Sequence, residues 1–477
     1  MTSDPSCPFP SPSTSPSDSA DRAGDPGRSV PGSGCSEPGP SRSVPDPSRR
    51  RFLRHLALGS AGLAAVPLGL TGAPRAPRRW VEGGHPGPSL PPGSSGRDEA
   101  YWEEVKARFP LRPGRIPMNA ANLCPAPLEV VEATEAAGRD VDSDVSFQNR
   151  AKYDTLREEV REGIAAYLGV TGDEIALVRN TSEGNATIVA GLPLGPGDEV
   201  VVFDQNHPTA NVAWDVRAAR EGFSVRRVSV PATPTSREEL LEPFLSAFGP
   251  RTRAVAFSDV SNVTGVRLPV REICHAARER GIHAHVDGAQ SFGVEVLDLK
   301  ALGCDSYASS SHKWFMGPKE AGVLYVQADR IPGIWPLAVG VGWGSGPGTS
   351  AQGARKFETL GQRNDATFAG LAAALSFHGE IGPQRIQERV QELVTQVKEG
   401  MAALGGTLIT SPDPSLSGGV VVATFAEMEA PVLHQRLYAE HGIAGAPTGG
   451  LRLCPHIYNT QADVEQALEA VAREIRG

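Results

Sequence analysis

Short apolar runs alternate with amphipathic runs from Glu174 to Gln327, and this alternation constrains the fold more than any other feature of the sequence. The apolar runs are EIALVRN, DEVVVFDQ, FSVRRVSV, TRAVAFSDV, GIHAHVDGA, CDSYASSS and AGVLYVQ. Their length and their Gly, Asp and Pro flanks are typical of strands, while ANVAWDVRAAREG and PVREICHAARERG between them are typical of helices. The pattern predicts an α/β fold with a mostly parallel sheet that helices cover on both faces.

Further elements flank this region. Two helices are expected before it, from Leu128 to Asp140 and around Tyr153 to Leu168. After it, the runs TFAGLAAALSFHGEIG, IQERVQELVTQVKEGMAAL, GGVVVATF, LRLCPHIYN and ADVEQALEAVAREI predict helices and strands of a small α+β domain. A chain of 477 residues exceeds what a single core usually holds. We therefore predict a large domain over residues 99–360 and a small C-terminal domain over 361–477.

Residues 1–98 are rich in Pro, Ser and Gly and bury too little apolar surface to order themselves. A twin-arginine export pattern lies within them, made by Ser48, Arg49, Arg50, Phe52 and Leu53. The apolar stretch that follows, Ala57 to Leu70, is shorter than a membrane span. We predict a leader and linker recognised by the twin-arginine machinery, with a periplasmic or extracellular destination. An uncleaved membrane anchor and a basic patch beside a core helix are the alternatives.

The charge and cysteine content exclude several classes of partner. A net charge of −9 with mixed signs gives no basic field, so a nucleic-acid partner is not expected. The six cysteines include no C-x-x-C pair, so the sequence predicts neither a disulfide framework nor a metal site. Small-molecule chemistry is the remaining expectation.

Two charged residues fall at the carboxyl ends of successive strands, where ligands bind in open α/β sheets. Asp287 ends the run GIHAHVDGA, and Lys313 follows CDSYASSS, 313 − 287 = 26 residues later. They could form a simple ion pair. Alternatively, a lysine in apolar surroundings has a lowered pKa and condenses with carbonyl groups, and a buried aspartate keeps the pyridine nitrogen of pyridoxal phosphate protonated.

The segment RNTSEGNATIVAG follows a predicted strand and opens an apolar helix. Thr181 and Ser182 offer hydroxyl groups and free N–H groups to an anion there. Taken alone, the segment is also typical of a simple helix cap. Together with Asp287 and Lys313 it predicts a phosphate site.

Four segments in this order, RNTSEGNAT, HVDGAQSFG, SSSHKWFMGP and LRLCPHIYN, resemble the class-V aminotransferase family of fold-type I pyridoxal-phosphate enzymes. That family includes cysteine desulfurases and isopenicillin N epimerase-like proteins, and the resemblance covers most of residues 115–475. It implies a seven-stranded sheet, pyridoxal phosphate as cofactor, an amino acid as substrate, and a homodimer with the active site at its interface.

The resemblance also implies roles for individual residues. Lys313 would form the Schiff base with the cofactor, Asp287 would pair with the pyridine nitrogen, and Gln290 would reach the phenolic oxygen. The phosphate would be held by Thr181, Ser182, Ser310 and His312.

Three further positions complete the site that the resemblance implies. His207, or alternatively Pro208, would stack on the cofactor ring, and Asn185 would touch the cofactor. Arg452 would clamp the substrate carboxylate in a bidentate geometry; the alternative is a surface arginine on a terminal strand.

This chain departs from the family pattern at two places. In FETLGQRN, Gln362 replaces the threonine that relatives lend to the phosphate of the neighbouring subunit. In HGIAGAPTGG, the mobile cysteine of desulfurases is missing, and Cys454 lies after Arg452. Desulfuration through a persulfide is therefore not expected by that route.

These expectations define an enzyme that acts at the α-carbon of an amino acid, with Lys313 as the base for the Cα proton. We predict an aminotransferase. An isopenicillin N epimerase-like racemase or a C–S or C–Se lyase is the alternative within the same chemistry. A non-catalytic sensor that binds pyridoxal phosphate is the alternative of another class.

Overall fold

The computed structural model describes residues 98–340 and 352–477. Arg49, Arg50 and the rest of the predicted leader up to residue 97 lie outside the described residues, as does the segment 341–351. Within the described ranges, no helix combines the length and the apolar character that a bilayer crossing needs.

A seven-stranded sheet forms the centre of the fold, and every strand predicted between Glu174 and Gln327 is present. The strands are β2 (Ile175–Val178), β3 (Glu199–Phe203), β4 (Ser224–Val228), β5 (Thr252–Ser258), β6 (His283–Asp287), β7 (Ser306–Ser310) and β8 (Gly322–Val326). Their order is β2-β8-β7-β6-β5-β3-β4. Only β8 runs antiparallel to its neighbours, so the predicted α/β class with a mostly parallel sheet is confirmed.

Successive side chains of the central strands point to opposite faces of the sheet, and each face has its own core. In β3, Val201 packs in one hydrophobic cluster and Val200 in another. The first cluster includes side chains of α3 (Leu128–Ser143), α4 (Phe147–Leu168), α7 (Glu238–Ala247), α8 (Val270–Glu279), α9 (Leu299–Leu302) and α10 (Ala366–Ile381). The second includes α5 (Thr181–Gly191) and α6 (Pro208–Glu221). The sheet is therefore covered on both sides, as predicted.

A smaller α+β region contains most of the C-terminal part of the chain. A three-stranded antiparallel sheet has the order β12 (Leu451–Leu453), β10 (Val421–Thr424), β9 (Thr407–Leu408). The helices around it are α11 (Pro383–Ala403), α12 (Ala430–His441) and α13 (Gln461–Arg476). A separate parallel pair joins β1 (Ile116–Pro117) to β11 (Ile443–Ala444), and α2 (Glu99–Ala107) packs in the same core through Trp102.

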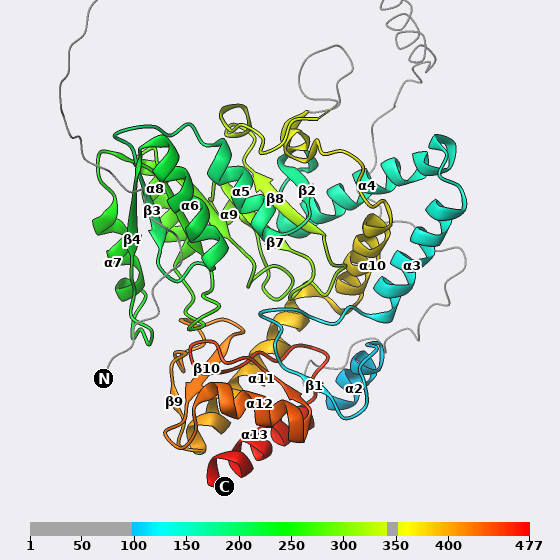
Figure 1. Ribbon diagram of the computed structural model, residues 1–477, viewed down its shortest axis with the longest axis vertical. Coiled ribbons are helices and arrows are strands. Elements are labelled where there is room, and N and C mark those ends of the chain that lie inside the picture. Colours follow the sequence, from blue (N-terminus) through cyan, green and yellow to red (C-terminus); the bar gives the residue numbers. More distant parts are fainter. Residues whose placement is uncertain (1–97, 341–351) are drawn as a thin grey trace, which may run out of the picture. The chain divides into compact units, whose positions relative to one another are not determined.

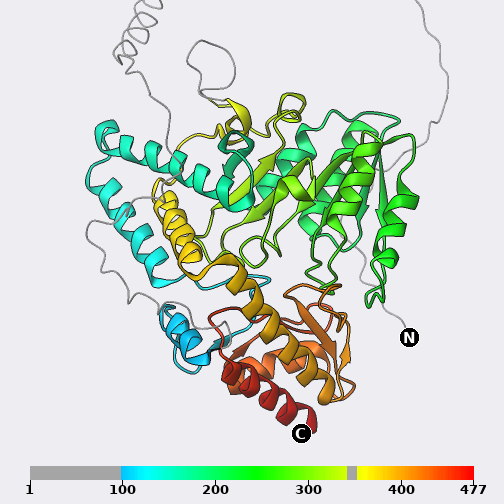
Figure 2. The same cartoon turned by 180° about the vertical axis from the view of Figure 1, so that it is seen from behind.

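The packing crosses the predicted domain boundary at residue 360 in both directions. Helix α10 lies after that residue, yet Leu371 packs in the core of the seven-stranded sheet. Figure 2 shows α10 (yellow) beside α3 and α4 (cyan), seen from behind. Conversely, α2 and β1 belong to the core of the C-terminal region. The division at 360 stays a prediction.

Candidate active site

The carboxyl ends of three neighbouring parallel strands bring the predicted residues to one edge of the sheet. Strand register pairs Ser258 of β5 with Asp287 of β6, and Asp287 with Ala308 of β7. Strand β7 ends two residues later at Ser310, and Lys313 follows after a short turn. The arrangement is the one expected for a ligand site in an open α/β sheet.

Asp287 is buried, with 6% of its surface exposed, and is well supplied with donors. Its Oδ2 accepts a hydrogen bond from Asn185 Nδ2 at 2.7 Å, and its Oδ1 accepts one from the Ala289 amide at 3.0 Å. Asp287 is thus prepared to face a cationic group such as a protonated pyridine nitrogen.

A chain of buried polar groups continues from Asn185 into the sheet. Asn185 Oδ1 lies 2.9 Å from His285 Nε2, and His285 Nδ1 lies 2.8 Å from Ser306 Oγ, which also lies 2.9 Å from His283 Nε2. Burial lowers the pKa of His285 to about 3 and that of His283 to about 4, so both rings are neutral. Because Asn185 Nδ2 donates to Asp287, Asn185 Oδ1 must accept from His285, and each hydrogen in the chain has one consistent position.

Lys313 is half-buried and precedes three apolar residues. Trp314, Phe315 and Met316, which follow it, are fully buried. Burial lowers the pKa of Lys313, the carboxylate of Asp287 opposes this, and the charge of Arg452 lowers the pKa further. Among the ion pairs of the described residues none involves Lys313, so the alternative of a simple ion pair with Asp287 does not hold. At a given pH, a larger fraction of this amine is therefore neutral and nucleophilic than for an ordinary lysine.

Two of the four predicted phosphate ligands, Thr181 and Ser310, are in contact where α5 begins. The Thr181 amide donates to Ser310 Oγ at 2.8 Å, and the two hydroxyl oxygens of these residues lie 2.6 Å apart. A methyl group on Gly184 would lie 2.8 Å from Ala308 Cβ, so the absence of a side chain lets α5 pack against β7 at this distance. His312 is half-buried, and burial, with the nearby charge of Lys313, lowers its pKa to about 4. Ser182 is exposed beside this cluster.

His207 caps the start of α6 and lies within reach of the charges in the site. Its Nδ1 lies 2.8 Å from Thr209 Oγ1, and Thr209 Oγ1 lies 3.5 Å from Ser182 Oγ. Burial lowers the pKa of His207, and the charges of Lys313 and Arg452 act in the same direction. The N-termini of α5 and α6 therefore meet here, with Pro208 as the first residue of α6.

Gln290 is fixed between two partners. Its Nε2 donates to the carbonyl oxygen of Ala121 at 3.1 Å, and its Oε1 accepts from Trp314 Nε1 at 2.8 Å. One hydrogen on Nε2 remains for a ligand, as the predicted contact with a phenolic oxygen requires. The tryptophan next to Lys313 thus holds the orientation of this amide.

Arg452 in β12 is buried, with 5% exposed, rather than a surface residue. Its Nη1 donates to the Asn262 carbonyl at 2.8 Å and its Nη2 to Asn119 Oδ1 at 2.9 Å. Its Nε is buried without a partner among the described residues. A buried donor without a partner is costly, and a carboxylate ligand would satisfy it.

The thiol groups near the site are protonated. Cys124 lies close enough to Lys313 for a thiolate there to affect the pKa of the lysine. The thiol is buried, however, and burial raises its pKa to about 12. Cys454 is also buried, and burial raises its pKa. Reactive cysteines need a thiolate and access to solvent, so neither has the properties of a persulfide-forming nucleophile.

Gln362, which replaces the family's threonine, is exposed and donates to the Arg363 carbonyl at 2.8 Å. Its predicted position at the cofactor of a partner subunit stays a prediction.

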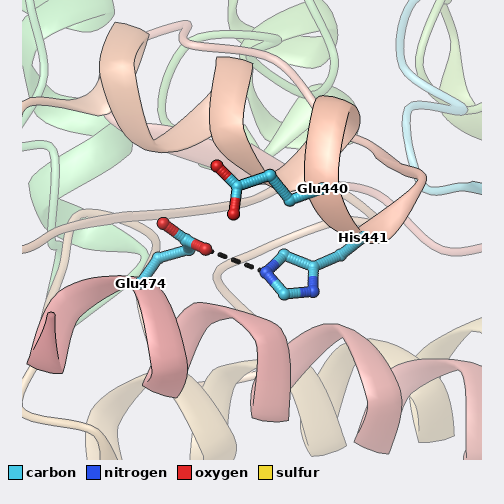
Figure 3. Close-up of side chains that lie close together, drawn as sticks. All are labelled: Glu440, His441 and Glu474. Carbon is cyan, nitrogen blue, oxygen red and sulfur yellow. Dashed lines mark hydrogen bonds and ion pairs between the residues drawn. The ribbon is translucent and has the colours of Figure 1, made fainter.

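One cluster of residues in the described ranges has the composition of a metal site, and it lies between α12 and α13. Glu440, His441 and Glu474 bring their ligand atoms within 4.8 Å of one another (Figure 3). His441 Nε2 lies 2.9 Å from Glu474 Oε1, and Arg436 Nη1 lies 3.3 Å from Glu474 Oε2. Ion pairing between the two helices accounts for this cluster without a metal ion.

Fold and site together define an α/β protein of the fold-type I class. Residues 120–467 match the aminotransferase class-V family, and the chain belongs to that family.

Two relatives show the range of activities in the family. The isopenicillin N epimerase of Streptomyces clavuligerus is 30% identical over 389 residues, which are 78% of this chain and 98% of the epimerase. The probable cysteine desulfurase of Methanothermobacter thermautotrophicus is 29% identical over 404 residues, 79% of this chain and 98% of the relative.

Two solved structures share the fold over nearly their whole length. A mutant of C-DES with glycine covalently linked to its PLP cofactor has a TM-score of 0.72, with 25% identity over 77% of this chain and 98% of C-DES. The cysteine desulfurase CsdA of Escherichia coli has a TM-score of 0.69, with 25% identity over 79% of this chain and 98% of CsdA. Pyridoxal phosphate, the predicted cofactor, is thus a cofactor of this fold and family.

Proposed function

We propose that this protein is a pyridoxal-phosphate enzyme that removes the α-proton of an amino acid. The observation that carries the proposal is that Asp287 and Lys313 follow each other at the carboxyl edge of the main sheet, and that Arg452 of β12 reaches the Asn262 carbonyl in the segment after β5. The residues fit the cofactor: the Asp287 carboxylate for the pyridine nitrogen, the Thr181 and Ser310 hydroxyls for the phosphate, and the Lys313 amine, whose pKa is lowered by burial. When bound, pyridoxal phosphate supplies an electron sink at the α-carbon.

The chain's own residues have distinct tasks in this proposal. Arg452, held by Asn119 and Asn262, binds the substrate carboxylate and orients the α-carbon toward Lys313. Lys313 then takes the α-proton onto Nζ, and its lowered pKa makes the neutral amine available for this.

We infer amino-group transfer as the outcome of this proton removal. Of the groups whose charges act on Lys313, Asp287 is engaged with Asn185 and Ala289, Arg452 is engaged with Asn119 and Asn262, and the Cys124 thiol keeps its proton. Lys313 is the group among them suited to take and return a proton. Amino-group transfer would require the same base to deliver this proton, on the same face, to the cofactor carbon bonded to the substrate nitrogen, so a single base is enough.

Epimerisation is the second candidate. It is favoured by the isopenicillin N epimerases of Streptomyces clavuligerus and Amycolatopsis lactamdurans, which are both 30% identical to this chain over 98% of their own length. It would require a second proton donor on the opposite face of the α-carbon. The buried, protonated Cys124 and Cys454 argue against desulfuration through a persulfide.

The experiment that separates these outcomes uses the full chain reconstituted with pyridoxal phosphate. It is incubated with a pool of L- and D-amino acids, with and without keto acids, and the products are identified by mass spectrometry and chiral chromatography. Keto acid formation that depends on an added keto acid supports amino-group transfer. Inversion without keto acid supports epimerisation instead. If every amino acid is unaltered, the result supports a non-catalytic sensor that binds pyridoxal phosphate and contradicts the proposed enzyme.

We also propose export by the twin-arginine route, on the pattern around Arg49 and Arg50. A fusion of residues 1–98 to a reporter should be exported, and replacement of both arginines by lysine should stop export. Equal export of the two fusions would refute the assignment.

A homodimer is the third proposal. Its support is the large apolar side chains at the start of α4, since Phe147 is 87% exposed and Val145 before it is 71% exposed. Sedimentation of the reconstituted protein should give twice the mass of one chain, and a single-chain mass across the concentration range would contradict this.

A further inference from the structure

A cavity of about 400 Å³ lies apart from the residues described so far, and neither Lys313, Asp287 nor Arg452 lines it. Its walls come from α11, from the loop that ends at Gly419, from the Val294–Glu295 turn and from Arg237. The cavity is large enough for a small organic molecule.

Lys398 of α11 lines this cavity and is buried, with only 5% of its surface exposed. Its Nζ lies 2.6 Å from Ser417 Oγ, whose own hydrogen is donated to the Asp413 carbonyl at 2.7 Å. Ser417 therefore accepts from Lys398, and two of the three ammonium hydrogens remain unused. No ion pair in the described part of the chain includes Lys398.

The other cations in the wall already have counter-charges. Arg267 and Glu295 form an ion pair with two short distances, 2.8 Å from Nη1 to Oε2 and 2.7 Å from Nη2 to Oε1. Arg237 Nη2 donates to Glu272 at 2.8 Å. Lys398 is thus the wall cation without a paired carboxylate, and an unpaired buried ammonium is unfavourable until an anion reaches it.

The same cavity has an apolar side. Val294, Val390 and Val394 line it beside the unpaired ammonium. We propose that the cavity binds a small anion, with a carboxylate or phosphate monoester head group on Lys398 and a short apolar body along the three valines. The assignment does not depend on the reaction proposed above.

Binding is measured by titration calorimetry on the full chain saturated with pyridoxal phosphate. The probes are hexanoate and butyl phosphate, which separate the two possible head groups. At least one probe should bind, and Lys398→Met should weaken that binding by about tenfold or more, while Lys398→Arg retains it. The control is Lys152→Met, which removes an exposed lysine paired with Asp140 on another helix and should leave binding unchanged.

Two results would overturn the proposal. The first is that neither probe binds. The second is that Lys398→Met binds the probes as tightly as the wild type, since the anion then lies elsewhere, for example at Arg452.

A measurement on the wild type covers the case in which Lys398→Met does not fold. In the protein labelled with ¹³C-lysine, the NMR signal of Lys398 reports its pKa, which is about 8 because burial and the charge of Arg267 lower it more than the carboxylate of Asp413 raises it. A bound anion favours the charged ammonium, so saturation with the probe should raise this pKa. An unchanged pKa at saturation would contradict the proposal.

Discussion

Asn185 links the carboxylate of Asp287 to a buried histidine: its Nδ2 donates to Asp287 Oδ2 at 2.7 Å while its Oδ1 lies 2.9 Å from His285 Nε2. Because Asn185 Nδ2 donates to the carboxylate, its Oδ1 accepts from His285 Nε2, and this sets the tautomer of the neutral His285 ring. Asn185 is thereby a positioning residue for the group predicted to hold the pyridine nitrogen.

Replacement of Asn185 tests that link. Asn185→Ala removes one hydrogen bond from the Asp287 carboxylate and leaves His285 Nε2 without an acceptor. The dissociation constant for pyridoxal phosphate, measured by absorbance titration, should rise by about 10- to 100-fold. Thr187→Ala on the same helix is the control, because Thr187 Oγ1 donates only to the Glu183 carbonyl. Equal cofactor affinity of the two variants would show that Asn185 does not act on Asp287.

Arg452 should affect substrate binding rather than cofactor binding. Arg452→Lys keeps the charge but loses the planar fork, and we expect the KM of the amino-acid substrate to rise by about tenfold or more. The affinity for pyridoxal phosphate should stay unchanged. Asn119→Ala, which removes one partner of the guanidinium, should raise KM by a smaller factor. A normal KM in Arg452→Lys would refute the role in carboxylate binding.

Lys398 should make stability depend on pH in a defined window. Its pKa is about 8 in the folded protein against an ordinary value of 10.5, so the unfolded chain binds the proton more tightly. The free energy of unfolding of the wild type should therefore rise with pH from about 8 to about 10.5. Below this range the charged Lys398 ammonium destabilises the folded protein to its full extent.

The comparison with Lys398→Met isolates this contribution, because other groups titrate equally in both proteins. At neutral pH, the free energy of unfolding of the variant should exceed that of the wild type by about 1–3 kcal/mol. This difference should become smaller as the pH rises from about 8 to about 10.5. Chemical denaturation at several pH values without added anion measures it. A difference between the two proteins that does not change with pH would contradict the assignment.

Close packing at the strand ends should make one glycine indispensable. A methyl group on Gly288 would lie 1.9 Å from the Tyr307 ring. Gly288→Ala should lower the free energy of unfolding by about 1–3 kcal/mol or more, because the ring cannot move in a filled core. Gly379→Ala in α10 is the matched control, since a methyl group there meets no atom within 4 Å. In a helix interior it should stabilise by about 0.5–1 kcal/mol. Similar thermal midpoints of the two variants would contradict the packing argument.

The main sheet was predictable because short segments bounded by Gly, Asp and Pro alternate with amphipathic helices, even though β4 and β7 contain few apolar residues. The pairing of β1 with β11 was not, since two residues carry no periodic signal and their partners lie far away in the sequence. The contact between Arg452 and Asn119 likewise joins residues 333 positions apart, and no local sequence pattern predicts it. Asp287 and Lys313 were found because strand ends mark the ligand edge of a parallel sheet.

The hydrogen-bonded histidines next to Asp287 were not predicted, although the sequence contains a signal for them. His283, His285 and Asp287 are alternate residues of one strand, so their side chains share a face of the sheet. Polar residues on one face of an otherwise apolar strand indicate a buried network rather than an ordinary core strand.

The central claim is that Lys313 takes the α-proton of an amino acid, and isotope exchange tests it most directly. The wild type and Lys313→Ala, both loaded with pyridoxal phosphate, are incubated in D₂O with a pool of L- and D-amino acids, and deuterium at the α-carbon is measured by mass spectrometry. We predict incorporation by the wild type and a loss of several orders of magnitude in the variant. Incorporation at an equal rate in Lys313→Ala, or none by the wild type, would contradict the account.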